Sequence, residues 1–323
     1  THHNQAPTVS APEPEQTKRQ GSMRPIDCVR LHREQCLIAN GARHSAIDLF
    51  TIGQFMTRLF ILFQYLIPQH VLSRCIGYVA RSEIPWFKNF IIKQFDGIYN
   101  IDWSVAVRKE PEQYVSFNDF FTRALTDDAR PLTGRLVSPA DGLVSVTGDI
   151  KHQRAIQAKG HDYSIPQLLG EALPESFNNG SFLTVYLAPS DYHRVHFPQQ
   201  GALQNARYIP GALFSVNQKT AAHVPGLFTR NERLVLRITS NEGDYYLVLI
   251  GAMIVAGIQP FWQPEPFKAQ RPIDQPMQAL AVDQGQEAGR FLLGSTAILI
   301  TQANQNWCVT PGATIKMGQT LVN

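Results

Sequence analysis

Residues 135–323 alternate short apolar runs with turn-forming residues, and this pattern constrains the fold more than any other feature. The runs are rich in β-branched and aromatic side chains and are separated by Gly, Pro and Asn, as in "SFLTVYLAP" (181–189) and "ERLVLRIT" (232–239). Short strands with turns at this spacing are typical of a sandwich or barrel. We therefore expect a β-rich body in this part of the chain.

One of these runs, "RFLLGSTAILI" (290–300), contains an interruption. Gly294, Ser295 and Thr296 stand between two apolar halves. A Gly-Ser pair lacks the side-chain packing that makes a strand favourable. The sequence therefore predicts a break in the strand at the Gly294–Ser295 bond.

A strongly apolar stretch lies nearer the N-terminus, "LFTIGQFMTRLFILFQYLI" (49–67). Thirteen of its 19 residues are apolar or aromatic, and Thr51, Gln54 and Arg58 share one face of a helix. A charge at the middle of a bilayer is costly. We therefore expect a helix that lies in the membrane interface instead of crossing it.

A second amphipathic stretch, residues 70–95, follows Pro68. From residue 49 to residue 95 the only acid is Glu83, so the net charge of this segment is +4. Positive charge attracts anionic lipids, and the tryptophan at position 86 suits the interface. The alternative is a pair of core helices packed on the rest of the protein, since periodicity alone cannot separate a core face from a membrane face. The basic residues are Arg58, Arg74, Arg81, Lys88 and Lys93.

A short helix is predicted in "EQYVSFNDFFTRAL" (112–125). Ser116 and Asn118 are both residue types that cap helix N-termini, so either can begin it. The texture of the chain changes from helical to strand-like shortly after this segment.

These patterns predict an α+β protein with three parts. Residues 1–22 hold three prolines and almost no apolar residues, and we interpret them as a disordered tail or as sequence left by cloning. Residues 23–126 form a helical, membrane-associating region, and residues 127–323 form the β-rich domain. The helical front and the β-rich body are both of ordinary domain size.

Charge and cysteine content exclude several classes of function. The net charge is only +3, and no Lys/Arg run alternates with aromatic residues, so we expect no nucleic-acid partner. The four cysteines form no CxxC pair and no zinc-like spacing with histidine, so we expect no metal and free thiols in a reducing compartment.

Four polar residues stand between the apolar runs of the β-rich domain. Asp141 lies in the turn "SPADG", His193 and His196 lie in "DYHRVHFP", and Ser295 follows the glycine of the broken strand. Aspartate, histidine and serine are the components of a base-activated nucleophile. Each residue taken alone also has a structural interpretation, as a turn cap, a hydrogen-bonded polar residue or a small residue in a bend.

The joint pattern is more specific, because eight stretches occur in order along the chain. It resembles the phosphatidylserine decarboxylase family of pyruvoyl-dependent lipid enzymes, in its prokaryotic form, from about residue 46 to residue 323. The stretches are "LFILFQYLIPQH" (59–70), "SFNDFFTR" (116–123), "SPADG" (138–142), "YHRVHFP" (192–198), "PGALFSVN" (210–217), "RNER" (230–233), "GAMIVAGI" (251–258) and "GRFLLGST" (289–296).

The resemblance implies that the proenzyme cleaves itself between Gly294 and Ser295. His196 would remove the proton from Ser295 Oγ, and Asp141 would orient that imidazole. The hydroxyl would attack the carbonyl carbon of Gly294, and elimination from the resulting ester would convert Ser295 into a covalent pyruvoyl group. His193 is our candidate for the acid of the later reaction.

The resemblance also implies the reaction and the partners. Phosphatidylserine would form a Schiff base with the pyruvoyl group, lose carbon dioxide and leave as phosphatidylethanolamine, in phospholipid biosynthesis. The α and β chains made by cleavage would remain together as a heterodimer, and we expect a homodimer of these. We expect a peripheral location on the cytoplasmic face of a bacterial cell membrane, where the protein contacts anionic lipid.

Two other functions stay open at this point. A serine hydrolase could use the same residues on an external lipid ester, and it would keep an intact chain that reacts with a fluorophosphonate. The second alternative is a non-enzymatic, membrane-anchored carrier or scaffold, because "VTPGATIKMGQTLV" (309–322) resembles the turn of lipoyl and biotin carriers. Lys316 lacks a Met on both sides, so we expect a solvent-facing turn residue. The fold expected for the body is a sandwich or barrel similar to the lipoyl/biotin-carrier hybrid.

Overall fold

The computed structural model of the chain describes residues 55–158, 160–253, 257–267, 270–292 and 294–322. Residues 58–323 form one compact unit. The predicted tail (1–22) and residues 23–54 of the predicted helical region lie outside the described residues. The division into domains at residues 22 and 126 stays a prediction.

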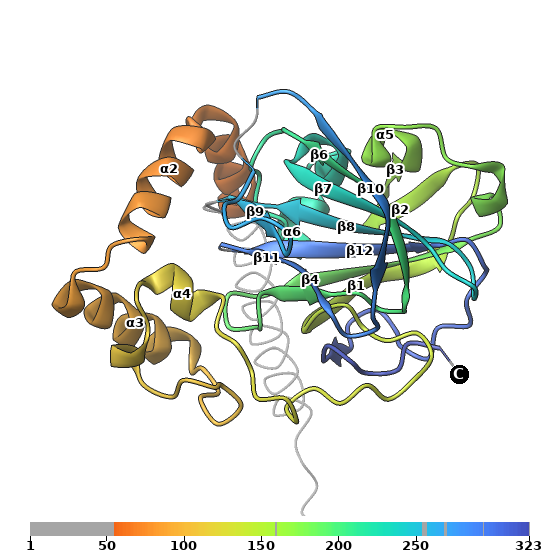
Figure 1. The fold of residues 1–323 in the computed structure, drawn as a ribbon. Coiled ribbons are helices and arrows are strands. Elements are labelled where there is room, and N and C mark those ends of the chain that lie inside the picture. The colour runs from red at the N-terminus through yellow and green to blue at the C-terminus, as the bar shows by residue number, and fades with distance from the viewer. Residues whose placement is uncertain (1–54, 159, 254–256, 268–269, 293, 323) are drawn as a thin grey trace, which may run out of the picture. The chain divides into compact units, whose positions relative to one another are not determined.

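An antiparallel sheet of eight strands forms most of the β-rich body (Figure 1), with the strand order β10-β6-β7-β8-β12-β4-β1-β13. Its central strands β8 and β12 are buried along their whole length. Continuous apolar runs are what strands covered on both faces require. The strands are β1 (Gly142–Asp149), β4 (Ser181–Leu187), β6 (Gly201–Ile209), β7 (Arg233–Thr239), β8 (Tyr245–Gly251), β10 (Ile273–Val282), β12 (Ser295–Thr301) and β13 (Thr314–Ile315).

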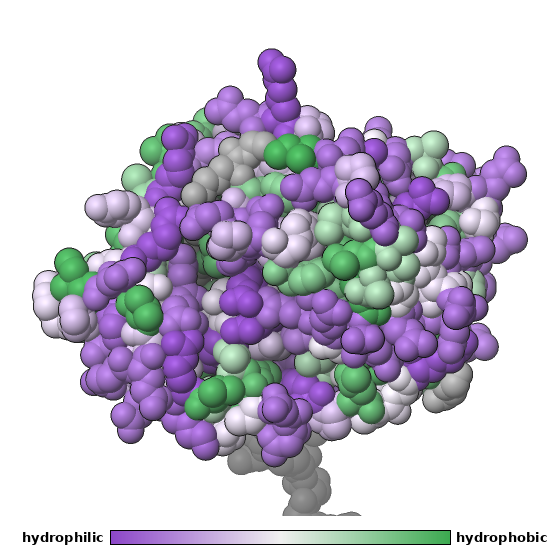
Figure 2. All heavy atoms as spheres, viewed as in Figure 1, coloured by the Kyte–Doolittle hydropathy of each residue, from purple (hydrophilic) through white to green (hydrophobic). Residues whose placement is uncertain are grey.

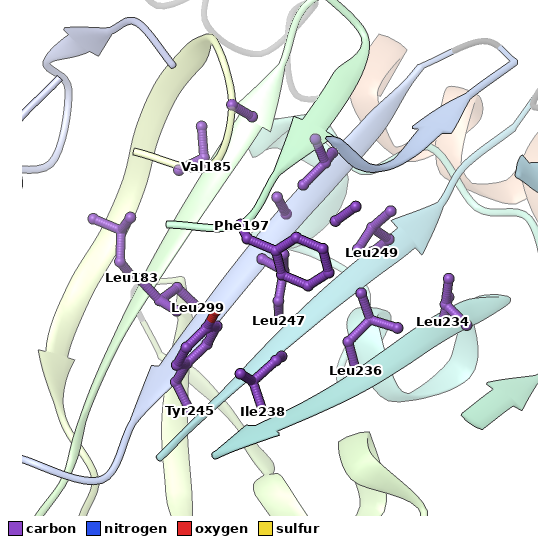
Figure 3. Packing of buried hydrophobic residues seen from close by; sticks show 14 of the residues in the cluster. Leu183, Val185, Phe197, Leu234, Leu236, Ile238, Tyr245, Leu247, Leu249 and Leu299 are labelled. Carbon is purple, nitrogen blue, oxygen red and sulfur yellow. The ribbon is translucent and has the colours of Figure 1, made fainter. Parts of the chain in front are cut away.

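Each face of this sheet carries its own hydrophobic core. Along β12, Ala297 and Leu299 belong to one core while Ile298 and Ile300 belong to the other, as the alternation of side chains along a strand requires. Figure 3 shows the first core, with Phe197 among leucines of the large sheet. The second core is completed by the hairpin of β2 (Arg154–Ala158) and β3 (His161–Ser164) and by the short helices α5 (Ile165–Leu169), α6 (Gln218–Ala221) and α7 (Leu227–Arg230).

A small sheet, in the order β5-β11-β9, packs on the first core. It consists of β5 (Arg194–His196), β9 (Ile258–Pro260) and β11 (Glu287–Phe291). The predicted break in residues 290–300 is confirmed, because β11 ends at Phe291 in the small sheet and β12 begins at Ser295 in the large one. The chain therefore passes from one sheet to the other immediately before the Gly294–Ser295 bond.

Helices precede the sheets, so the protein combines N-terminal helices with a β-rich body. Residues 55–66 are helical, and Pro68 stands before the next helix, so the helix predicted to end at this proline is confirmed over its described part. The stretch predicted at 70–95 forms two helices, α2 (Gln69–Ala80) and α3 (Pro85–Tyr99). A turn of 3-10 helix, η1 (Pro111–Gln113), comes next, and a second, η2 (Glu175–Phe177), precedes β4.

The short helix predicted at 112–125 is α4 (Phe117–Phe121). Of the two candidate caps, Ser116 begins it, since the Ser116 Oγ accepts a hydrogen bond from the amide of Asp119. A serine oxygen in this position satisfies one of the free N–H groups of the first turn.

Two glutamines of the helical front contact the β-rich body, whereas Arg58 of the predicted polar face is exposed. Gln64 is fully buried, and its Oε1 accepts a hydrogen bond from the amide of Ser215 at 2.8 Å. Gln69 Oε1 accepts one from the amide of Leu213 at 2.7 Å. These two glutamines hold the helices against the loop before α6.

Large apolar side chains on the same helices are exposed. Tyr78 is 80% exposed and Trp86 is 73% exposed, and hydrophobic residues are visible over α2 and α3 at the left of Figure 2. The exposed set comprises Leu59, Phe60, Leu62, Phe63, Tyr65, Leu66, Val71, Tyr78, Val79, Ile84, Trp86, Phe90, Ile98 and Tyr99.

Within the described residues, no single helix is long and apolar enough to cross a membrane. The helices Phe55–Leu66 and Gln69–Ala80, bent by 88° relative to each other, satisfy the length and composition of a span only as a pair.

Candidate active site

Ser295 is the first residue of β12, and it lies between Leu187 of β4 and Gly251 of β8. Its side chain is fully buried, and its Oγ has no hydrogen-bond partner among the described residues. Buried hydroxyls are normally hydrogen-bonded, so this oxygen is an exception, and within the described chain no competing hydrogen bond holds it.

Gly294, the residue before it, has a φ of +44°. A Cβ built at this position meets no atom within 4 Å, so space does not demand a glycine here. The left-handed backbone does, because other residues adopt it only at an energetic cost. A glycine therefore supports the turn that brings the chain into β12.

Asp141 lies in the predicted turn, immediately before β1, and it is almost fully buried. Arg130 donates two hydrogen bonds to its carboxylate, from Nε at 2.9 Å and from Nη2 at 2.5 Å. The amide of Met317 donates a third at 2.8 Å, and Lys316 Nζ lies 3.2 Å away. Burial alone would raise the pKa of Asp141, but the hydrogen bonds and charges of Arg130 and Lys316 lower it overall. This carboxylate is held ionised.

His196, at the end of β5, is also buried. Its Nδ1 lies 2.7 Å from the carbonyl oxygen of Gly285, which can only accept, so Nδ1 carries the proton. Its Nε2 is then an acceptor, and it lies 3.0 Å from the hydroxyl of Tyr192. Burial lowers the pKa of His196, so the imidazole is neutral. A neutral imidazole with a lone pair on Nε2 is the form that a general base requires.

His193 stands immediately before β5. Its Nδ1 donates to the carbonyl oxygen of Asp191 at 2.8 Å, and its ring packs against Phe121 of α4 at 4.0 Å. Its Nε2 is buried without a partner among the described residues. Burial lowers the pKa of His193 to about 3. The neutral imidazole can therefore accept a proton at Nε2. To act as an acid, His193 must first be protonated there.

Main-chain hydrogen bonds bring the three candidate segments together. The amide of His196 donates to the carbonyl of Pro139 in the aspartate turn at 2.8 Å, and the amide of Phe291 donates to the carbonyl of His193 at 3.0 Å. Within the described part of the chain, the structure gives no hydrogen bond that joins the side chains of Asp141, His196 and Ser295. Their roles as a set therefore stay predictions.

A family model described as phosphatidylserine decarboxylase matches residues 117–323, and a second model, described as PSD, matches residues 59–100. This chain belongs to the phosphatidylserine decarboxylase family.

Curated relatives support the assignment. A phosphatidylserine decarboxylase proenzyme of Alcanivorax borkumensis is 49% identical over 253 residues, which are 75% of this chain and 87% of that protein. Proenzymes of the same name from Pseudomonas fluorescens and Azotobacter vinelandii are each 46% identical over 278 residues, which are 82% of this chain and 96% and 97% of those proteins.

Sequence reasoning missed some residues at this family site. Arg130 pairs with Asp141, yet in the sequence it stands in "DDARPL" beside two acids, which suggest a surface ion pair. Tyr192 binds His196, yet in the motif "YHRVHFP" only the two histidines indicate chemistry. Lys316, expected in a solvent-facing turn, is 54% exposed but forms an ion pair with Asp141.

In the described part of the chain, no three His, Cys, Asp or Glu side chains cluster. Cys75 and Cys308 are free thiols. Cys28 and Cys36 lie outside the described residues.

Proposed function

We propose that this chain is a phosphatidylserine decarboxylase proenzyme that cleaves itself between Gly294 and Ser295 and then converts phosphatidylserine into phosphatidylethanolamine and carbon dioxide. The observation that carries the proposal is the buried, unpartnered Ser295 Oγ, immediately after a glycine in a left-handed conformation. The names of the relatives, which call them proenzymes, agree with it.

Cleavage begins at the Ser295 hydroxyl. His196 Nε2 takes the proton from Oγ as Oγ bonds to the carbonyl carbon of Gly294. The C–N bond then breaks, and the proton passes to the leaving nitrogen, so the amide becomes an ester. The hydrogen bond from Tyr192 to Nε2 has to break before this transfer. The ionised Asp141 stabilises the imidazolium that forms.

The ester then breaks by elimination. A proton leaves the α-carbon of Ser295, and the ester oxygen departs with the carboxylate of Gly294. The remaining dehydroalanine adds water and releases ammonia, which leaves a pyruvoyl group at the start of the new chain. Burial of this position excludes the bulk water that would hydrolyse the ester too early.

The residues present fit this group. Its precursor hydroxyl is buried and free of competing hydrogen bonds among the described residues. When formed, the pyruvoyl group supplies an electron sink for the loss of carbon dioxide. We propose that His193 moves a proton during that step, because its buried Nε2 is unpartnered among the described residues and its carbonyl binds the amide of Phe291, four residues before Ser295.

We also propose that the exposed apolar residues of α2 and α3 lie in the membrane interface, where the substrate resides. Arg58, Arg74 and Arg81 would attract anionic lipid. The corresponding location is the cytoplasmic face of a bacterial membrane. A homodimer of cleaved chains and the carrier-like fold of the body are part of the same proposal.

A direct assay tests the function. Purified wild-type protein is expected to run as two chains on a denaturing gel and to release carbon dioxide from phosphatidylserine vesicles. An uncut chain that reacts with a fluorophosphonate and hydrolyses lipid esters would show a serine hydrolase. An uncut chain without either activity would show a carrier or scaffold.

Replacement of Tyr78, Trp86 and Phe90 together by glutamine is expected to weaken binding to anionic vesicles at least about tenfold, because burial of one such side chain contributes about 1.5–3 kcal/mol. Cosedimentation with vesicles measures this. Self-cleavage should remain, since these exposed side chains lie outside the site. Wild-type affinity should also fall as salt rises.

The matched control replaces Ile156 and Leu280, two exposed apolar residues of the β-rich body, by glutamine. This control variant should bind vesicles as the wild type does. Equal binding by the α2–α3 variant and the wild type would show that the exposed face does not enter the membrane.

A further inference from the structure

A pocket of about 700 Å³ lies between α2 and the neighbouring ends of β6 and β7 in the large sheet. One wall comes from α2 and carries His70, Arg74 and Arg81. The other wall comes from the sheet and carries Tyr208 and Glu232. The two walls therefore differ in charge.

The cationic wall is available to a ligand. Arg74 donates one hydrogen bond, from Nε to the carbonyl of His70 at 3.3 Å. Within the described ranges, no carboxylate pairs with Arg74 or Arg81. Guanidinium groups bind phosphate through paired N–H donors, so two of them without a carboxylate partner among the described residues suit a phosphate.

Glu232 belongs to the motif "RNER", in which the flanking residues Asn231 and Arg233 support the backbone. Asn231 Nδ2 donates to the carbonyls of Phe214 and Gly251. Arg233 donates to four main-chain carbonyls. The Glu232 side chain, by contrast, is only 9% exposed, and its Oε1 has no hydrogen-bond partner within the described chain.

The register of the sheet places Glu232 near Ser295. Ser295 pairs with Gly251, and the amide of Gly251 donates to the carbonyl of Glu232 at 2.8 Å, so the three residues form one row across β12, β8 and the start of β7. Ala297 lies two residues after Ser295, and Leu234 lies two residues after Glu232. Both belong to the first core, and residues two apart on a strand share a face, so Ser295 and Glu232 point to that same face of the sheet.

Gly251 leaves the space between them open. A Cβ built on Gly251 would lie 3.6 Å from Glu232 Oε1, so the carboxyl group lies over this glycine. Neighbouring strands are about 4.8 Å apart, so Glu232 and Ser295 are about 10 Å apart across the row. The acidic wall of the pocket thus adjoins the cleavage position.

We propose that this pocket binds the phosphatidylserine headgroup, with Arg74 and Arg81 on the phosphate and Glu232 on the ammonium group, from which it takes a proton. This inference rests on the proposed function. The ammonium has to lose one proton before its nitrogen can act as a nucleophile, and the proton moves from that nitrogen to the Glu232 carboxylate. The cationic wall matches the phosphate and the acidic wall matches the ammonium group, whereas the carboxylate on the same carbon as the ammonium is the group that leaves as carbon dioxide.

The titration of Glu232 agrees with this role. Burial raises the pKa of Glu232 to about 7, although the neighbouring Tyr208 hydroxyl acts to lower this pKa. A base with a pKa near the working pH is more effective than an ordinary carboxylate. Only the ionised form accepts the proton, so kcat should rise as the pH rises through about 7.

Kinetics with a soluble short-chain phosphatidylserine, without vesicles, test the cationic wall. An R74Q/R81Q variant is expected to raise KM at least tenfold with little change in kcat. Lys109→Gln, which removes an exposed charge outside the pocket, should leave both values unchanged. An unchanged KM in R74Q/R81Q would overturn the phosphate assignment.

Competition identifies the ligand. Glycerophosphoethanolamine should compete with substrate in the wild type and at least tenfold less well in R74Q/R81Q. Inorganic phosphate at the same concentration should compete poorly. Equal competition by inorganic phosphate would show a general anion site and overturn the headgroup assignment.

A pH profile tests the acidic wall. Glu232→Gln is expected to cleave itself as the wild type does, to lower kcat at least tenfold and to lose the rise near pH 7, whereas Glu232→Asp should keep a shifted rise. A full wild-type profile in Glu232→Gln would overturn the assignment. If Glu232→Gln is not cleaved, the pH profile of Glu232→Asp tests the assignment instead. An unshifted pH profile with a wild-type kcat in Glu232→Asp would overturn the role of Glu232. A wild-type protein that neither cleaves nor releases carbon dioxide would instead refute the proposed function.

Discussion

A Ser295→Ala chain is expected to remain in one piece and to release no carbon dioxide from phosphatidylserine. The substitution removes the oxygen that attacks Gly294, and with it the precursor of the pyruvoyl group. Wild-type protein should instead give residues 1–294 and residues 295–323, and the second chain should resist Edman degradation because its first residue carries no amine. A denaturing gel and a carbon dioxide assay measure both results.

The structure predicts that this loss is not caused by unfolding. Ser295 Oγ is buried without a hydrogen-bond partner within the described chain. Removal of an unsatisfied buried hydroxyl is neutral or stabilising by about 1 kcal/mol. The melting temperature of Ser295→Ala should therefore equal or exceed that of an uncleaved reference such as His196→Ala.

The neighbouring hydroxyl offers a matched control. Thr296 Oγ1 is also buried and unpartnered, and Thr296→Val replaces the threonine with a side chain of the same shape. This variant should cleave itself and decarboxylate. An active wild type that is uncut, or a Ser295→Ala chain that still cleaves, would refute self-cleavage at this bond.

Separate alanine substitutions of His196 and His193 are expected to have different effects. His196→Ala should remain a single chain, because it lacks the neutral imidazole that accepts the proton of Ser295. His193→Ala should still cleave, at least in part, and should form the pyruvoyl group, yet it should decarboxylate at least about 100-fold more slowly, as expected for loss of a proton-transfer group. Gels and intact masses measure cleavage, and carbon dioxide release measures turnover.

His223, an exposed histidine of the loop after α6, provides the control. His223→Ala should cleave and turn over as the wild type does. If His193→Ala blocks cleavage while His196→Ala matures normally, the two assignments are reversed. Equal turnover by His193→Ala and the wild type would leave His193 with only its packing against Phe121.

Local patterns in the sequence predicted local structure well. The break before Ser295 and the start of a short helix at Ser116 or Asn118 depend on neighbouring residues, because backbone freedom and the nearest N–H groups decide them, and the structure then selected Ser116. The order of the eight motif stretches along the chain also predicted the family. The partners of the site residues could not be predicted in this way, since Arg130 reaches Asp141 through the fold and the chain offers many other arginines.

The sequence by itself determined the chemical groups, the strand-rich body and the amphipathic front. Only the tertiary structure decided which face of that front is covered. A helix period of 3.6 residues separates a polar side from an apolar side but does not say which side meets the protein. Gln64 and Gln69 bind the backbone of the loop before α6, so the side of the helices that carries these two residues is covered, while Arg58 and most of the large apolar side chains stay exposed. The same holds for Glu232 and Ser295, which lie far apart in the chain and become neighbours only through the register of three strands.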